Sequence, residues 1–308
     1  MADFEIKNVV AVIPEGTTTI GEFAFYRCTS LQSITIPESV TEIGEGAFKD
    51  CCSLQSITIP ESVTKIGRGA FSGCSSLKSI TIPESVTKIG RGAFSGCSSL
   101  KSIVVAKGNP KYDSREGCNA IIETATNTLI VGCPFTIIPK SVTEIGSHAF
   151  SGCSSLQSIT IPESATKIGR YTFYGCSTLQ SITIPERVTE IGYEAFRGCS
   201  SLQSITIPEG VTVIDESAFF GCSSLQSIVI PKGVKKIEVI AFSGCTALTT
   251  VTLPVGVKKF DNTSFDECKA LTTIYVPAKK TDYYKRRLPE ELHSLIVELQ
   301  PAKKAKKK

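Results

Sequence analysis

The sequence predicts a repeat solenoid, a coil of short stacked units joined by parallel β-sheet. A block of 23 residues recurs along most of the 308-residue chain, and one copy runs from Leu54 to Ser76. A proline marks the same position in successive copies, as at Pro37, Pro60 and Pro83. Apolar residues also keep fixed positions within each copy. A fixed period of this length is typical of units that contact only their neighbours, so we expect one elongated domain.

Each unit is expected to contain two short strands. Leu54, Ile57 and Ile59 alternate with polar residues, which predicts a strand paired in parallel with the same segment one turn along the coil. Pro60 ends that strand because it has no N–H to donate to the ladder. Residues 63–66 alternate again and predict a second short strand on the opposite side of the coil.

The second strand is followed by a glycine, Gly67 in this copy, and then by an alanine and a phenylalanine. We expect one helical turn here. In later copies the glycine becomes Asp215, Glu238 and Asp261, a series that favours a helix N-cap over a strained turn with positive φ.

Two further columns are expected to fill the core. Phenylalanine recurs from Phe25 to Phe265, and stacked rings bury a large apolar area. Ten of the thirteen cysteines form another column, and only Cys52, Cys118 and Cys133 lie outside it. Side chains in one column of a parallel stack point the same way, so we expect reduced structural thiols rather than disulfides. With two histidines and no CxxC pair, we expect no metal site and no cofactor.

The charge is concentrated at the carboxyl end. The formal net charge is +4, and residues 279–308 hold ten basic against four acidic residues. No apolar run has the roughly 20 residues that a membrane span needs. The amino terminus shows no secretory signal, so we expect a cytoplasmic protein, or a surface or secreted one if a leader is missing from this chain.

The columns Leu-x-x-Ile-x-Ile-Pro-x-x-Val-x-x-Ile-Gly-x-x-Ala-Phe-x-x-Cys resemble the BspA-type (Treponema pallidum-type) leucine-rich repeat over roughly residues 9–277. The resemblance implies a right-handed, curved solenoid with a parallel sheet on its concave face and short second strands and helical turns on the other side. It also implies protein–protein contact as the usual role. Some members of the family are bacterial surface proteins that attach to host matrix.

The period is broken once and then ends. Residues 106–138 form an irregular rung, in which two apolar runs around a Thr/Asn turn at 119–131 predict a β-hairpin. We interpret it as a divergent rung, with a dedicated binding loop as the alternative. The solenoid is expected over 1–287, followed by a capping helix over 288–300, because Leu292, Leu295, Ile296 and Leu299 form one apolar stripe at helical spacing. Residues 301–308 are expected to be a disordered basic tail.

One cluster of large side chains departs from the otherwise small, polar surface. The outward strand positions are nearly all Ser and Thr, which lack the area of binding hot spots. Six aromatic or guanidinium residues instead replace smaller ones on adjoining rungs beside the expected helical turns. We predict that they bind a protein partner: Arg170, Tyr171, Tyr174, Tyr193, Arg197 and Phe220.

The sequence favours a non-catalytic protein–protein interaction scaffold, monomeric, with an unidentified protein partner. No recurring nucleophile, acid or base accompanies His148 or His293, and no phosphate-binding glycine loop is present. One alternative is a nucleic-acid or ribosome-associated factor, making weak nonspecific contacts through its basic carboxyl end. Another is an exported adhesin that binds host matrix proteins. The basic residues of the first alternative are Lys285, Arg286, Arg287, Lys303, Lys304, Lys306, Lys307 and Lys308.

Overall fold

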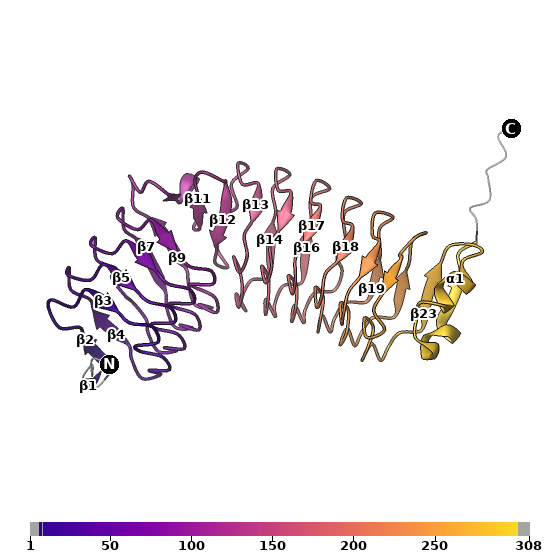
Figure 1. Ribbon diagram of the computed structural model, residues 1–308, viewed down its shortest axis with the longest axis horizontal. Coiled ribbons are helices and arrows are strands. Elements are labelled where there is room, and N and C mark those ends of the chain that lie inside the picture. Colours follow the sequence, from indigo (N-terminus) through magenta and orange to yellow (C-terminus); the bar gives the residue numbers. More distant parts are fainter. Residues whose placement is uncertain (1–5, 8, 301–308) are drawn as a thin grey trace.

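The computed structural model describes residues 6, 7 and 9–300, which stack into one elongated, bent solenoid (Figure 1). The predicted coil of parallel-paired rungs is confirmed. The predicted tail at 301–308 lies outside the described residues.

First strands of neighbouring regular rungs pair in parallel with a spacing of 23 residues, as Ser158 does with Ser181. This row is divided into separate sheets, because residues 56–58 form no strand and Ser204 makes only an isolated bridge to Ser181. Residues 54–59 form no β-ladder, but Ile57 and Ile59 are still buried, so apolar packing keeps this segment in the stack. The first strands are β2 (Val10–Val12), β4 (Ser33–Thr35), β7 (Ser79–Ile82), β9 (Ser102–Val105), β14 (Ser158–Thr160), β16 (Ser181–Thr183), β19 (Ser227–Val229), β21 (Thr250–Thr252) and β23 (Thr273–Val276). A short strand, β1 (Ile6–Lys7), pairs antiparallel with β2.

The second strands are two residues long and also pair in parallel, as predicted. Their inner residue is buried in most rungs, as with Ile66 and Ile168, while the outer one is charged in most rungs. They are β3 (Thr19–Ile20), β5 (Glu42–Ile43), β6 (Lys65–Ile66), β8 (Lys88–Ile89), β13 (Glu144–Ile145), β15 (Lys167–Ile168), β17 (Glu190–Ile191), β18 (Val213–Ile214), β20 (Lys236–Ile237) and β22 (Lys259–Phe260).

The third side of each rung, equivalent to residues 67–76 and called here the turn edge, is a run of β-turns. The expected helical turn is therefore wrong. Within this rung the N–H groups of Ala70, Ser72 and Cys74 donate to carbonyls three residues back. The intervening N–H groups, at 69, 71 and 73, donate to carbonyls of the next rung at 2.7–3.1 Å. Bonds that alternate between the two rungs leave no room for the i→i−4 pattern of an α-helix.

Close stacking, and not helix capping, accounts for the glycine at position 67 of the repeat. A Cβ on Gly67 would lie 2.4 Å from the carbonyl carbon of Gly44 in the preceding rung. Gly67 has no positive φ, so the expectation that this turn is unstrained holds, but no helix follows for it to cap. The row of second strands is interrupted between β17 and β18, at the rung where this glycine becomes Asp215.

The two core columns form as predicted. Neighbouring phenylalanine rings stack with centroids 5.1–5.6 Å apart and planes within 16° of parallel. All thirteen cysteines are free thiols, and most column thiols donate to the carbonyl of a phenylalanine in the preceding rung, as Cys74 does to Phe48 at 3.1 Å. Each of these carbonyls also accepts a backbone N–H from its own rung, as Phe48 does from Cys51, so the thiol adds a second hydrogen bond that links neighbouring rungs.

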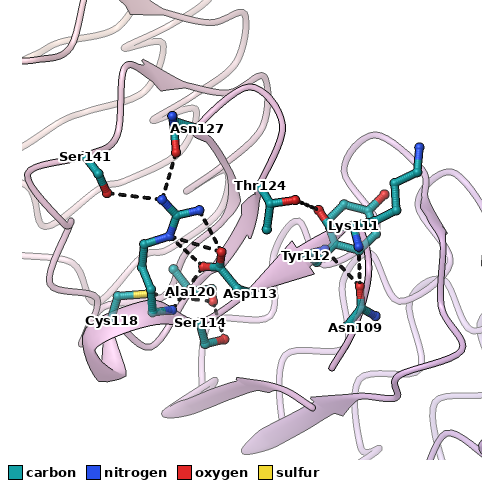
Figure 2. A network of polar contacts seen from close by, with 11 residues as sticks. Asn109, Lys111, Tyr112, Asp113, Ser114, Cys118, Ala120, Thr124, Asn127 and Ser141 are labelled. Carbon is teal, nitrogen blue, oxygen red and sulfur yellow. Dashed lines mark hydrogen bonds and ion pairs between the residues drawn. The ribbon is translucent and has the colours of Figure 1, made fainter. Parts of the chain in front are cut away.

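The irregular rung contains the predicted hairpin, formed by β11 (Ile121–Glu123) and β12 (Thr128–Val131), with β10 (Tyr112–Asp113) added at its edge and a 3₁₀ turn, η1 (Arg115–Gly117). Its side chains hold it in the stack (Figure 2). The Arg115 guanidinium donates to the Asp113 carboxylate at 2.7 and 2.8 Å and to Asn127 Oδ1 at 2.8 Å. Asn109 Nδ2 donates to the carbonyls of Pro83 and Val86 in the preceding rung.

The hairpin bends the solenoid. On the turn edge, the rung of Gly96 contacts the rung of Ser151 directly, through an N–H···O bond of 2.8 Å. The extra residues thus widen the stack only on the other sides, and β11 and β12 lie on the outer side of the bend (Figure 1). The core is also split here, because Ile121 packs into the amino-terminal cluster and its neighbour Ile122 into the carboxyl-terminal one.

The carboxyl-terminal cap differs from the helix predicted over 288–300. It consists of α1 (Thr281–Lys285), a 3₁₀ helix η2 (Glu290–Leu295) and β24 (Ile296–Glu298), which pairs in parallel with β23. The open edge of β23 offers unpaired backbone groups, and the extended Ile-Val-Glu segment satisfies them where a helix could not. Leu292, Leu295 and Ile296 pack on the core as predicted, whereas Leu299 is 41% exposed.

Among the described residues, no helix has the length and apolar character needed to cross a bilayer.

Candidate protein-binding surface

The six residues predicted to bind a partner lie together on the turn edge, around Tyr171. Its ring stacks on His148 with centroids 4.7 Å apart and meets Tyr193 and Tyr174 edge-on at 5.1 and 6.0 Å. These rings come from three successive rungs. His148 and Tyr171 occupy the same repeat position, whereas Tyr193 occupies the position of Arg170. We call Arg170, Tyr171, Tyr174, Tyr193, Arg197 and Phe220 the aromatic patch.

Arg197 continues this surface to the next rung. Its Cζ lies 4.5 Å from the centre of the Phe220 ring, and its Nη1 lies 3.3 Å from Glu194 Oε1. Glu194 is buried, and its hydrogen bond with Tyr193, followed by burial and by Tyr171, raises the pKa of Tyr193. The patch is therefore a connected set of rings with one ion pair, between Arg197 and Glu194, held in place before any partner arrives.

The backbone has a positive φ at three residues in or beside the aromatic patch. His148, Tyr171 and Glu194 have φ of 63°, 56° and 52°, a conformation that costs a residue with a Cβ about 1 kcal/mol or more. In the amino-terminal rungs the same position is glycine, as at Gly69 and Gly92. The φ at this position is positive in the regular rungs from Phe23 to Ile240 but not at Thr263, and the fold tolerates its cost at the large side chains of His148 and Tyr171.

A groove runs along the turn edge from the aromatic patch into the amino-terminal half. It has a volume of about 580 Å³. Phe23 lies at one end and Glu194 and Arg197 at the other. Between them lie Arg68 and Arg91, followed by His148, Tyr171 and Tyr174. The binding residues predicted from the sequence did not include Arg68, Arg91 or His148. The two arginines could have been found, since Arg68, Arg91 and Arg170 occupy the same position of the repeat.

Arg170 lines a second depression of about 440 Å³, together with Arg68, Arg91, Ser147 and His148. Burial lowers the pKa of His148, and the charges of Arg68 and Arg91 lower it further. Arginine side chains from three rungs thus gather beside the His148 imidazole, at the boundary between the groove and the aromatic patch.

The face of first strands presents the expected small hydroxyls but also one apolar depression. It has a volume of about 730 Å³ and lies between the irregular rung and β14, where Ile137 is 78% exposed. Nothing in the structure indicates what would cover it.

At the basic carboxyl end, some side chains pack against the solenoid and others are exposed. The Arg287 guanidinium lies 3.7 Å from the centre of the Tyr283 ring and donates to the Tyr283 carbonyl at 2.8 Å. Tyr284 is fully buried, and its hydroxyl donates to the Pro254 carbonyl. Lys285 and Arg286 are exposed, whereas the lysines from 303 onward lie outside the described residues. In the part of the chain that the structure covers, no three His, Cys, Asp or Glu side chains are grouped to hold a metal ion.

Comparison with known proteins identifies the family. The model of the BspA type leucine rich repeat region matches residues 4–115, 132–238 and 212–288, in six copies. This chain belongs to that family. The unmatched stretch between the first two segments, residues 116–131, lies within the irregular rung.

Solved structures agree with this family. A leucine-rich repeat protein from Eubacterium ventriosum is 29% identical, with a TM-score of 0.74 over 86% of this chain and 78% of that one. One from Bacteroides ovatus is 28% identical, with a TM-score of 0.53 over 95% and 84%. The pneumococcal vaccine antigen PcpA shares the fold at 19% identity, with a TM-score of 0.69 over 95% and 80%. No curated protein matches the chain.

Proposed function

We propose that this protein is a non-catalytic protein-interaction scaffold whose partner binds the aromatic patch. The family to which it belongs consists of leucine-rich repeat proteins, which generally serve as protein-interaction scaffolds. The observation that carries the proposal is the connected surface from His148 through Tyr171 to Phe220, on an edge where other rungs have mostly Ser and Gly.

The patch suits a protein partner better than the strand face does. Tyr and Arg dominate the energetics of interfaces, because they lose solvent over a large area while keeping polar atoms for hydrogen bonds. The rings are braced by one another, so little conformational entropy is lost on binding. Ser and Thr side chains on the strand face offer neither advantage.

The test is affinity capture from the native host, with the wild-type protein and two variants. Tyr174→Ala with Arg197→Lys removes an exposed ring and the planar group over Phe220, yet keeps a cation beside the buried Glu194. We expect this pair to weaken binding of the captured partner at least tenfold and to leave the melting temperature nearly unchanged.

The matched control places bulky side chains on the strand face, Ser181→Tyr with Thr183→Tyr, and should bind as wild type does. If the control loses the partner while the patch variant keeps it, the strand face is the binding site and the patch is not.

A further inference from the structure

The length of the groove on the turn edge can be measured by counting the rungs that line it. On this edge the rung of Phe23 is followed by the rungs of residues 46, 69, 92 and 148, because the irregular rung contributes nothing here. Phenylalanine rings of neighbouring rungs are 5.1–5.3 Å apart in this half. From Phe23 to His148 there are therefore four steps, or about 21 Å, which is the reach of about six residues of extended chain. The lining residues of the next two rungs, from Tyr171 to Arg197, continue the groove beyond His148.

The charge of the groove is positive and lacks counter-ions. Lys49, Arg68, Arg91 and Arg197 line it against two acids, Glu45 and Glu194. Glu194 is already paired with Arg197. Among the described residues, neither Arg68 nor Arg91 has a carboxylate within ion-pair distance, and the same holds for Arg170.

Some cations elsewhere on this solenoid form ion pairs with glutamates of neighbouring rungs, unlike Arg68, Arg91 and Arg170. Lys65 pairs with Glu42 of the preceding rung at 2.5 Å, and Lys167 lies between Glu144 and Glu190 at 3.8 and 3.4 Å. Cross-rung pairing is thus readily available to the repeat. Three unpaired arginines on one edge repel one another. The pKa of His148, which burial lowers, is lowered further by the charges of two of them, Arg68 and Arg91. An arriving anion would relieve that repulsion, and the planar guanidinium binds an oxyanion with two parallel hydrogen bonds.

We propose that the groove binds an extended acidic segment of the partner protein, whose oxyanion side chains contact Arg68, Arg91 and Arg170 while its next residues reach the aromatic patch. The inference rests on the proposed function and specifies its partner. A carboxylate and a phosphate ester offer the same oxyanion chemistry to arginine, so aspartate, glutamate or a phosphorylated residue could supply the anion.

The test uses fluorescein-labelled octapeptides and fluorescence polarisation with the full chain. One peptide carries glutamate at three alternate positions, a second replaces the central glutamate with phosphotyrosine, and a third has glutamine at all three. We expect at least one of the first two to bind at least tenfold more tightly than the glutamine peptide. The stronger of the two identifies the source of the anion.

Two variants distinguish binding at the groove arginines from nonspecific electrostatic attraction to the positively charged protein. Arg68→Gln, Arg91→Gln and Arg170→Gln together should weaken the acidic peptide at least tenfold. The control removes the same charge from exposed residues on the turns after the prolines, with Lys140→Gln, Arg187→Gln and Lys232→Gln, and should lose no more than twofold.

A third variant blocks the groove without changing its charge. Ser72→Tyr with Ser95→Tyr introduces the side chain that the fold already accepts at the equivalent Tyr174, so folding should be retained while the peptide is excluded. Circular dichroism melting curves check all three variants.

The inference is overturned if no acidic peptide binds the wild-type protein, or if the control weakens binding as much as the groove variant does. It is also overturned if a 20-nucleotide RNA binds with this arginine dependence while the peptides do not. Partner capture that still depends on Tyr174 and Arg197 would then leave the proposed function standing without its acidic segment.

Discussion

We predict that the buried thiol of Cys222 contributes to the free energy of unfolding and that this contribution is lost at alkaline pH. The residue has no exposed surface, and its Sγ donates to the Phe196 carbonyl at 3.2 Å. Burial raises the pKa of this thiol from its ordinary value of 9.0 to about 12, because the thiolate would have to form away from water. The unfolded chain exposes the same thiol and releases its proton near the ordinary value.

The size and sign of the effect follow from that difference. The unfolded state loses its proton first, so the thiol's contribution is complete below about pH 9 and is lost as the pH rises toward 12. One pH unit above the unfolded pKa, the loss is about 1.4 kcal/mol for one thiol. Cys222→Ala has no such group. Its cost of about 1–2 kcal/mol at pH 7.5, from lost packing and a lost hydrogen bond, should therefore shrink by about 1.4 kcal/mol at pH 10.

Urea unfolding followed by circular dichroism, in the presence of a reductant, measures this difference at pH 7.5, 9 and 10. Cys52→Ala is the matched control, because Cys52 is exposed and solvent reaches its thiol in both states. The quantity compared is the difference in unfolding free energy between each variant and the wild type. A Cys222→Ala difference that is the same at pH 7.5 and pH 10 within about 0.5 kcal/mol would refute the reasoning.

Three further predictions concern the stack itself. Phe196→Ala removes one ring from the continuous column and should lower the unfolding free energy by about 3–5 kcal/mol, measured by urea titration. Gly67→Ala places a Cβ against the neighbouring backbone and should cost about 1–3 kcal/mol, whereas Gly21→Ala, at the same repeat position with nothing within 4 Å, should melt as wild type does. Deleting 288–308 uncovers the last rung and should lower the melting temperature, whereas deleting only 301–308 should not; equal melting curves would argue against the cap.

The periodic part of the structure could be predicted because identical residues meet identical neighbours. Phe71 and Cys74 were assigned to the core from their columns alone, and both are fully buried. The turn edge was misread because Gly67 followed by Ala70 and Phe71 fits a helix start as well as a chain of turns. The choice depends on N–H groups that bond to the next rung, and the sequence of one unit does not show those bonds.

Residues of the candidate binding surface could be predicted only where a large side chain replaces the small residue found at the same repeat position in other rungs. Tyr174 and Arg197 stood out against serine, and the structure places both on one surface. Arg68 and Arg91 were missed because they occur in two identical copies and look like part of the repeat. Their proximity to Arg170 depends on the irregular rung leaving the turn edge, a matter of three-dimensional stacking. The carboxyl end was misjudged for a similar reason, since the pairing of Ile296 with Ile274 depends on a strand edge.

The hairpin of the irregular rung also has a consequence for the order in which the chain folds. Ile121 is part of the amino-terminal core and Ile122 is part of the carboxyl-terminal one. The hairpin therefore covers the last rung of the first half and offers the first packing surface to the second half. During synthesis, the first half acquires its cover as soon as residues 121–131 leave the ribosome. It can then fold before the second half exists, and the later rungs add to a template that is already complete.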